Sequence, residues 1–143
     1  MNFIVTTDSG CDLPYSLLKE RDIIPFPIKY ELDGKVHEDT MLHEDCRRFY
    51  DDMRKGAVPK TSQINIMEFV DFWRPIAERG LPIVHVCLGS GISGTYDNGL
   101  TAVELLNEQL PEAQIPLVDS TLASGEYGML ALKAADMRDE NKT

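Results

Sequence analysis

The sequence has 143 residues, 43% of them hydrophobic, and a net charge of −10, which fits one domain with a real core and leaves little room for two. With 24 acidic against 14 basic residues and no basic run longer than Arg47-Arg48, nucleic acid and anionic membrane surfaces are poor partners. An acid follows the start too soon for a signal peptide, no apolar run approaches the ~20 residues of a membrane span, and the three cysteines show no C-x-x-C spacing, so we expect a cytoplasmic protein with reduced thiols and no stable membrane insertion.

The chain opens with a short apolar and β-branched run from Phe3 to Thr6. This run predicts a buried strand, and Asp8-Ser9-Gly10 behind it predicts a turn. A helix should follow, with Asp12 as its N-cap and Pro14 in its first turn, where a missing N–H costs nothing.

Residues 23–32 are predicted to be extended, because Pro25 and Pro27 exclude a helix. The two prolines favour an edge position, and the Asp33-Gly34 pair is typical of a hairpin turn. Residues 42–55 then carry apolar side chains on one helical face, acids early and bases late, so both periodicity and charge predict a helix.

A loop over residues 56–63 precedes the next predicted helix. Asn65 with Glu68 three positions later resembles a capping box, and Pro75 should kink that helix near its end. The nearly continuous apolar run of residues 82–88 predicts a central parallel strand covered on both faces.

The remaining pattern predicts a helix over residues 96–109 with Leu100 turned inward, a strand over 115–118 and a helix over 124–138. Strands and helices therefore alternate along the chain. This alternation predicts an α/β fold in a single domain, a three-layer, mostly parallel sheet with helices on both faces.

Two hydroxyl-bearing signatures, Thr61-Ser62-Gln63 and Ser93-Gly94-Thr95, each stand ahead of a predicted helix. A helix start has N–H groups without partners and carries roughly half a positive charge, so hydroxyls there help to hold a carboxylate or phosphate. Ser and Thr are also ordinary N-caps, but two such starts indicate an anion site. In parallel sheets ligands lie beyond the carboxyl ends of the strands.

Residues 89–94 also spell G-x-G-x-x-G after a predicted strand and before a predicted helix, with Asp119 ending the next strand. That pattern leaves a nucleotide-dependent enzyme as an alternative, although the motif normally follows the first strand of its domain. The nucleophile-elbow motif G-x-S-x-G is not matched, because Thr95 stands where the motif requires its last glycine. No spacing of the three histidines indicates a metal site or a catalytic base.

Residues 8–14 (D-S-G-C-D-L-P), Thr61-Ser62-Gln63, Ser93-Gly94-Thr95-Tyr96 and Asp119-Ser120 with Ser124-Gly125 together resemble the DegV family in order and approximate spacing. The resemblance runs from Asp8 to about Arg138. It implies a bacterial fatty-acid-binding protein of two α/β domains, of which residues 1–143 match the amino-terminal lipid-binding domain and the carboxyl-terminal domain is absent.

The resemblance also implies a role for particular residues. Thr61 and Ser93 would contact the carboxylate of a long-chain fatty acid, with neighbouring donors from Ser62, Gly94 and Thr95. Four further residues would line the pocket, namely Asp8, Ser9, Asp119 and Ser120.

The resemblance implies no catalytic residue, no metal and no cofactor beyond the bound acid. A separate fatty acid kinase would receive the acid and make the acyl phosphate. The chain departs from the family after Gln63, where Ile64-Asn65-Ile66 replaces Pro-Ser-Pro. With half of the pocket missing, an exposed apolar groove would favour self-association. A purely structural or interaction module is the third hypothesis.

Overall fold

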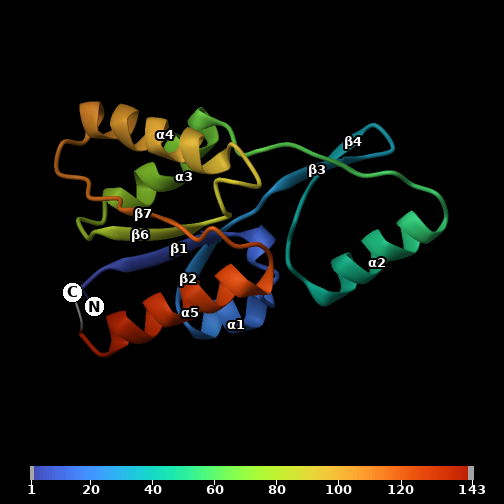
Figure 1. Ribbon diagram of the computed structural model, residues 1–143, viewed down its shortest axis with the longest axis horizontal. Coiled ribbons are helices and arrows are strands. Elements are labelled where there is room, and N and C mark those ends of the chain that lie inside the picture. Colours follow the sequence, from blue (N-terminus) through green and yellow to red (C-terminus); the bar gives the residue numbers. More distant parts are fainter. Residues whose placement is uncertain (1, 142–143) are drawn as a thin grey trace.

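A four-stranded parallel sheet forms the centre of the molecule in the computed structural model, which describes residues 2–141 (Figure 1). Its strands, in spatial order, are β2 (Ile23–Phe26), β1 (Ile4–Asp8), β6 (Ile83–Cys87) and β7 (Leu117–Asp119). The helices α3 (Ile66–Ala77) and α4 (Thr95–Gln109) cover one face, and α1 (Tyr15–Glu20) and α5 (Gly125–Asp139) cover the other. The predicted three-layer α/β fold is confirmed.

The core is divided by the sheet into two apolar clusters. On the side of α3 and α4, Phe69 and Trp73 stack at 4.5 Å between ring centroids and pack above the sheet. On the other side, Val5 and Val86 of the sheet meet Tyr127 and the alanines of α5. Both faces of the central strands are thus covered, as their continuous apolar runs predict.

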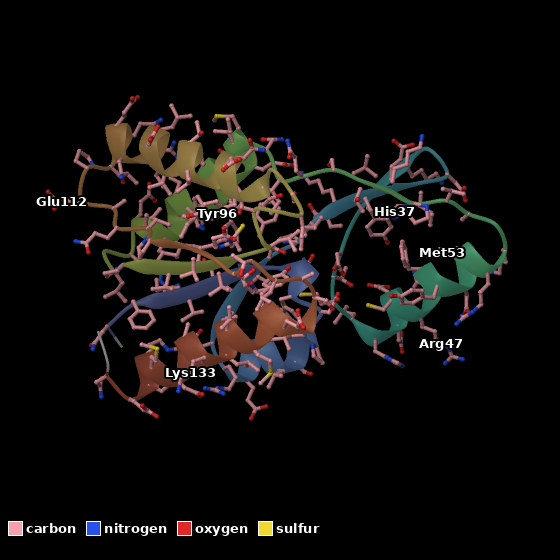
Figure 2. The ribbon with its side chains drawn as sticks, viewed as in Figure 1. His37, Arg47, Met53, Tyr96, Glu112 and Lys133 are labelled. Atoms are coloured by element: carbon pink, nitrogen blue, oxygen red, sulfur yellow. The ribbon has the colours of Figure 1, made fainter. Side chains whose placement is uncertain are left out.

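A second, smaller sheet and α2 project from one end of the molecule (Figure 1). The sheet is antiparallel and consists of β4 (Lys35–Glu38), β3 (Lys29–Leu32) and β5 (Lys60–Thr61). Figure 2 shows Arg47 and Met53 of α2 (His43–Arg54) in this projecting part. Every residue of α2 is at least partly exposed, so the helix adds little to the main core.

The single extended stretch predicted for residues 23–32 is divided between the two sheets. Residues 23–26 form the edge strand β2, and residues 29–32 form β3 of the small sheet. The predicted edge position and the hairpin are confirmed, with Asp33 and Gly34 both at positive φ between β3 and β4. The short strand β5 lies within the predicted loop, and β7 begins two residues later than expected.

Two predictions about helices are wrong. Asp12 does not cap α1, which begins after Pro14; Asp12 has φ 54° and its carboxylate accepts a bond from Ser124 Oγ at 2.5 Å. Leu100 is 44% exposed, because the small residues Gly99 and Ala102 take the inward positions of α4.

The capping box of α3 is confirmed. The side chain of Asn65 accepts from Glu68 N at 2.9 Å, and the side chain of Glu68 accepts from Asn65 N at 3.0 Å. Pro75 lies in the last turn of the same helix.

Among residues 2–141, no helix combines the length and the apolar character needed to cross a bilayer.

Candidate functional site

The first hydroxyl motif lies on the small sheet rather than at a helix start. Thr61 ends β5 and is paired with Tyr30 of β3, so the two side chains share one face of that sheet. Tyr30 packs edge-to-face on Phe49 of α2, with ring centroids 5.0 Å apart. Thr61 and Ser62 are exposed, and α3 has Asn65 as its N-cap. Thr61 and Ser62 therefore precede α3 as expected but do not cap it, and their hydroxyls remain open to a ligand.

The second motif does stand at a helix start. The helix α4 begins at Thr95, and its N-cap residue, Gly94, has no side chain that accepts from the first N–H groups. Ser93 Oγ accepts from Thr95 N at 3.2 Å and lies 2.9 Å from Thr95 Oγ1. Ser93 is half-buried, whereas Thr95 is 4% exposed. The remaining N–H groups and the positive end of the helix favour an anion here.

The structure joins the two motifs directly. Ile64 N donates to Thr95 Oγ1 at 3.3 Å, and Asn98 Nδ2 donates to Ile64 O at 2.8 Å. The side chain of Gln63 lies so close to Gly94 that a Cβ on Gly94 would collide with its amide oxygen. The chain leaving Thr61 and Ser62 is thus fastened to the first turn of α4. The bond from Asn98 and the close approach of Gln63 to Gly94 are contacts that sequence reasoning missed.

Asp8 and Ser9 organise the carboxyl edge of the sheet from inside. The buried carboxylate of Asp8 accepts from Tyr127 Oη at 2.5 Å, Gly10 N at 3.1 Å and Leu88 N at 3.3 Å. Burial raises the pKa of Asp8, against the lowering effect of these bonds. Ser9 Oγ accepts from Ile28 N at 3.0 Å. Both side chains connect loops to one another, and Tyr127 is a partner that the sequence did not indicate.

Asp119 and Ser120 are engaged in a similar way after β7. The carboxylate of Asp119 accepts from Ser90 Oγ at 2.6 Å, and from Ser90 N and Thr121 N at 3.0 Å each. These bonds lower the pKa of Asp119. Ser120 Oγ accepts from Leu122 N at 3.1 Å and donates to Leu122 O at 3.2 Å. In a nucleotide site Asp119 would hold a ribose hydroxyl, whereas here its oxygens hold the glycine loop.

A buried polar cluster lies on β1 and β6, where the possible metal-ligand atoms of Asp8, His85 and Cys87 are all within 4.8 Å of one another. His85 Nδ1 is 2.8 Å from Thr6 Oγ1. Burial lowers the pKa of His85 to about 3 and raises the pKa of the Cys87 thiol. At neutral pH the cluster therefore contains an uncharged imidazole and a protonated thiol, which is a poor metal ligand until it ionises.

The glycine loop of residues 89–94 gives a prediction about which glycine the fold itself requires. A Cβ on Gly89 would lie 2.8 Å from both Leu122 N and Thr121 C, whereas a Cβ on Gly91 would meet no atom within 4 Å. Backbone atoms cannot move aside cheaply, so Gly89→Ala should cost about 2 kcal/mol of unfolding free energy. Gly91→Ala is the matched control and should change it by less than about 0.5 kcal/mol. Urea denaturation measures both, and equal effects would contradict the close approach of Gly89 to the backbone of Thr121 and Leu122.

Comparisons with known proteins give matches to sequences and to solved structures. Residues 2–143 match the sequence profile of the DegV family, a family of uncharacterised proteins. A DegV domain-containing protein of Clostridium perfringens is 34% identical over 142 residues, which make up 99% of this chain and 49% of that protein. The chain spans about half the length of the curated relatives it matches.

Two solved structures resemble the whole chain. A hypothetical protein from Thermotoga maritima, whose structure reveals a fatty acid binding function, superposes with a TM-score of 0.87 at 28% identity, over 100% of this chain and 51% of that one. A stearic acid-binding protein from Eubacterium ventriosum gives a TM-score of 0.84 at 26% identity, over 99% of this chain and 49% of that one.

Proposed function

This chain belongs to the DegV family, and we propose that it binds a long-chain fatty acid whose carboxylate lies between Thr61 and Ser93. The observation that carries the proposal is the junction between the two hydroxyl motifs. Bonds from Ile64 to Thr95 and from Asn98 to Ile64 fasten the chain after Thr61 to the start of α4, beside Ser93. We therefore propose that these two hydroxyls, from distant parts of the sequence, converge on one head group.

Local donors must supply the attraction for the head group, because the protein carries a net charge of −10. Ser93 and the first N–H groups of α4 offer hydrogen bonds, and the helix dipole adds a partial positive charge. Ser62 and Gly94 flank the two main contacts. Each methylene of an alkyl tail that is buried contributes about 0.8 kcal/mol, so the tail supplies most of the affinity and the hydroxyls fix the orientation.

The proposed role is binding and presentation rather than catalysis. A serine nucleophile needs a neighbouring base to take its proton. Among residues 2–141, the side-chain partner of Ser93 Oγ is the hydroxyl of Thr95 at 2.9 Å, which is not a base. The bound acid would be presented to a separate fatty acid kinase, which would form the acyl phosphate.

Removing both hydroxyls tests the assignment. We expect Thr61→Ala combined with Ser93→Ala to weaken oleate binding by about tenfold, or about 1.4 kcal/mol, as measured by isothermal titration calorimetry. The loss is modest because water replaces an exposed hydroxyl in part. The control is Thr101→Ala, since Thr101 is exposed on α4 and its hydroxyl donates to Asp97 O of its own helix.

Two results would count against the proposal. Equal oleate affinity in the parent and the double variant would remove Thr61 and Ser93 from the head-group site. Saturable binding of NAD or ATP that Gly91→Val abolishes would favour the nucleotide alternative. Solvent extraction of the purified protein followed by mass spectrometry offers an independent check, because a copurified fatty acid would identify the ligand class directly.

A further inference from the structure

Thr95 occupies a position that makes direct contact with a ligand unfavourable. It is 4% exposed, and its hydroxyl oxygen already lies within hydrogen-bond distance of two groups, Ile64 N at 3.3 Å and Ser93 Oγ at 2.9 Å. A threonine hydroxyl has one hydrogen to donate and two lone pairs that accept. The direction of the bond between Thr95 and Ser93 therefore decides what each hydroxyl has left to offer.

The surroundings of Thr95 favour one direction. If Ser93 donated to Thr95, the oxygen of Thr95 would accept twice, and its own buried hydrogen would need another acceptor. Within residues 2–141 the hydrogen-bond partners of Thr95 Oγ1 are Ile64 N and Ser93 Oγ. A buried O–H without an acceptor costs about 1–3 kcal/mol. Thr95 therefore donates to Ser93.

This direction fixes what Ser93 can do. Its oxygen accepts from Thr95 Oγ1 at 2.9 Å and from Thr95 N at 3.2 Å, which uses both lone pairs. Its own hydrogen is the one hydrogen-bonding function that remains. Ser93 therefore keeps an O–H donor free for a ligand, and a matching head group must be an acceptor such as an ionised carboxylate.

We infer that Thr95 is a positioning residue for Ser93, through a hydrogen-bond chain that runs from Ile64 N to Thr95 Oγ1 to Ser93 Oγ. The inference rests on the proposed function and deepens it, because it moves Thr95 from the ligand contacts to the groups that orient them. Asn98 supports the chain by holding Ile64 O at 2.8 Å. Because this hydrogen-bond chain begins at Ile64, the orientation of Ser93 also depends on the segment that follows Thr61.

A double-mutant cycle tests the inference. Thr95→Val keeps the shape and removes the hydroxyl, and we expect it to weaken oleate binding by about fivefold in calorimetry. Thr95→Ser should restore the affinity of the parent. In a Ser93→Ala background, Thr95→Val should have no further effect, because the two residues act as one unit. Thr101→Val is the matched control on the same helix and should leave binding unchanged.

A second measurement probes the hydrogen-bond chain in the absence of ligand. Hydrogen exchange at the Ile64 amide should speed up in Thr95→Val and stay slow in Thr95→Ser, since only the former loses the acceptor. If the thermal midpoint of Thr95→Val falls, Thr95→Ala gives the same comparison without placing a methyl group against the Ile64 amide.

The outcomes are distinguishable. An equal loss of affinity from Thr95→Val with and without Ser93 would show that Thr95 acts independently and would overturn the inference. Unchanged exchange at Ile64 would also overturn it. A Ser93→Ala variant that binds oleate as well as the parent does would instead overturn the proposed function.

Discussion

The protein should lose stability steadily as the pH falls below about 6.5, and His85 should be the group responsible. His85 is fully buried, with the rings of Phe69 and Trp73 centred 5.5 and 5.2 Å from its own. Desolvation lowers its pKa from 6.5 to about 3. Between these two values the unfolded chain binds a proton that the folded protein excludes, so stability is complete above pH 6.5 and is lost on acidification.

The expected slope is about 1.4 kcal/mol per pH unit once the pH is well below 6.5. Asp8 acts in the opposite direction, because its raised pKa makes the folded state take up a proton before the unfolded state does. Urea denaturation between pH 7 and pH 5 of the parent and of His85→Gln isolates the histidine. Glutamine cannot be protonated but can still bond to Thr6, so its curve should be flatter.

The control for this experiment is His37→Gln, which removes an exposed histidine on β4. It should leave the slope of the parent unchanged. Parallel pH profiles for the parent and His85→Gln would show that His85 accepts its proton in the folded state, contrary to its burial.

Replacing Arg138 should cause the other large loss of stability. Its guanidinium is 3% exposed and donates from Nη1 to Asp22 O at 2.7 Å and from Nη2 to Arg21 O at 2.8 Å. These carbonyls lie just beyond the end of α1, so Arg138 fastens the last turn of α5 to α1. A hydrogen bond in which one partner is charged contributes about 1.5–3 kcal/mol to the unfolding free energy. Replacing Arg138 would also leave the two carbonyls without this partner.

We expect Arg138→Met to lower the unfolding free energy by about 3 kcal/mol and the thermal midpoint by about 10 °C. Methionine preserves much of the buried volume, which limits the change to the lost bonds. Arg54→Met is the matched control, because Arg54 forms an exposed i,i+3 pair with Asp51 at 2.7 Å. It should cost less than about 1 kcal/mol. A loss of similar size in both variants would contradict the assigned role of Arg138.

The alternation of strands and helices could be predicted from the sequence because each element carries its own signal. The apolar run of residues 82–88, for example, predicts a covered strand, and β6 lies at the centre of the sheet. The capping box of Asn65 and Glu68 is equally local. Such features depend on neighbours within a few positions, so sequence reasoning finds them.

The errors concern contacts between distant parts of the chain. Asp12 looks like an N-cap, but Ser124 is its partner across 112 positions. Leu100 fits an apolar stripe, yet Gly99 lies against Leu117, where a Cβ would approach its side chain to 2.6 Å. A stripe defined by large side chains overlooks the small residues that let α4 approach the sheet closely.

For the candidate site, too, the local motifs could be predicted and the contacts between them could not. The hydroxyls of Thr61 and Ser93 stand out as motifs, and α4 does begin at Ser93-Gly94-Thr95. The connections made by Gln63, Ile64 and Asn98 could not be predicted, because they involve a backbone amide, a backbone carbonyl and a close approach to Gly94. The proposed roles of Ser93 as a head-group contact and of Thr95 as its positioning residue both depend on these contacts.

The small sheet and α2 form an insertion whose two ends are fixed to the body at the same edge of the main sheet. The chain leaves the body at Ile28, bonded to Ser9, and returns at Ile64, bonded to Thr95. The length of the hairpin or of α2 can therefore change in evolution or by engineering without shifting the register of the parallel strands.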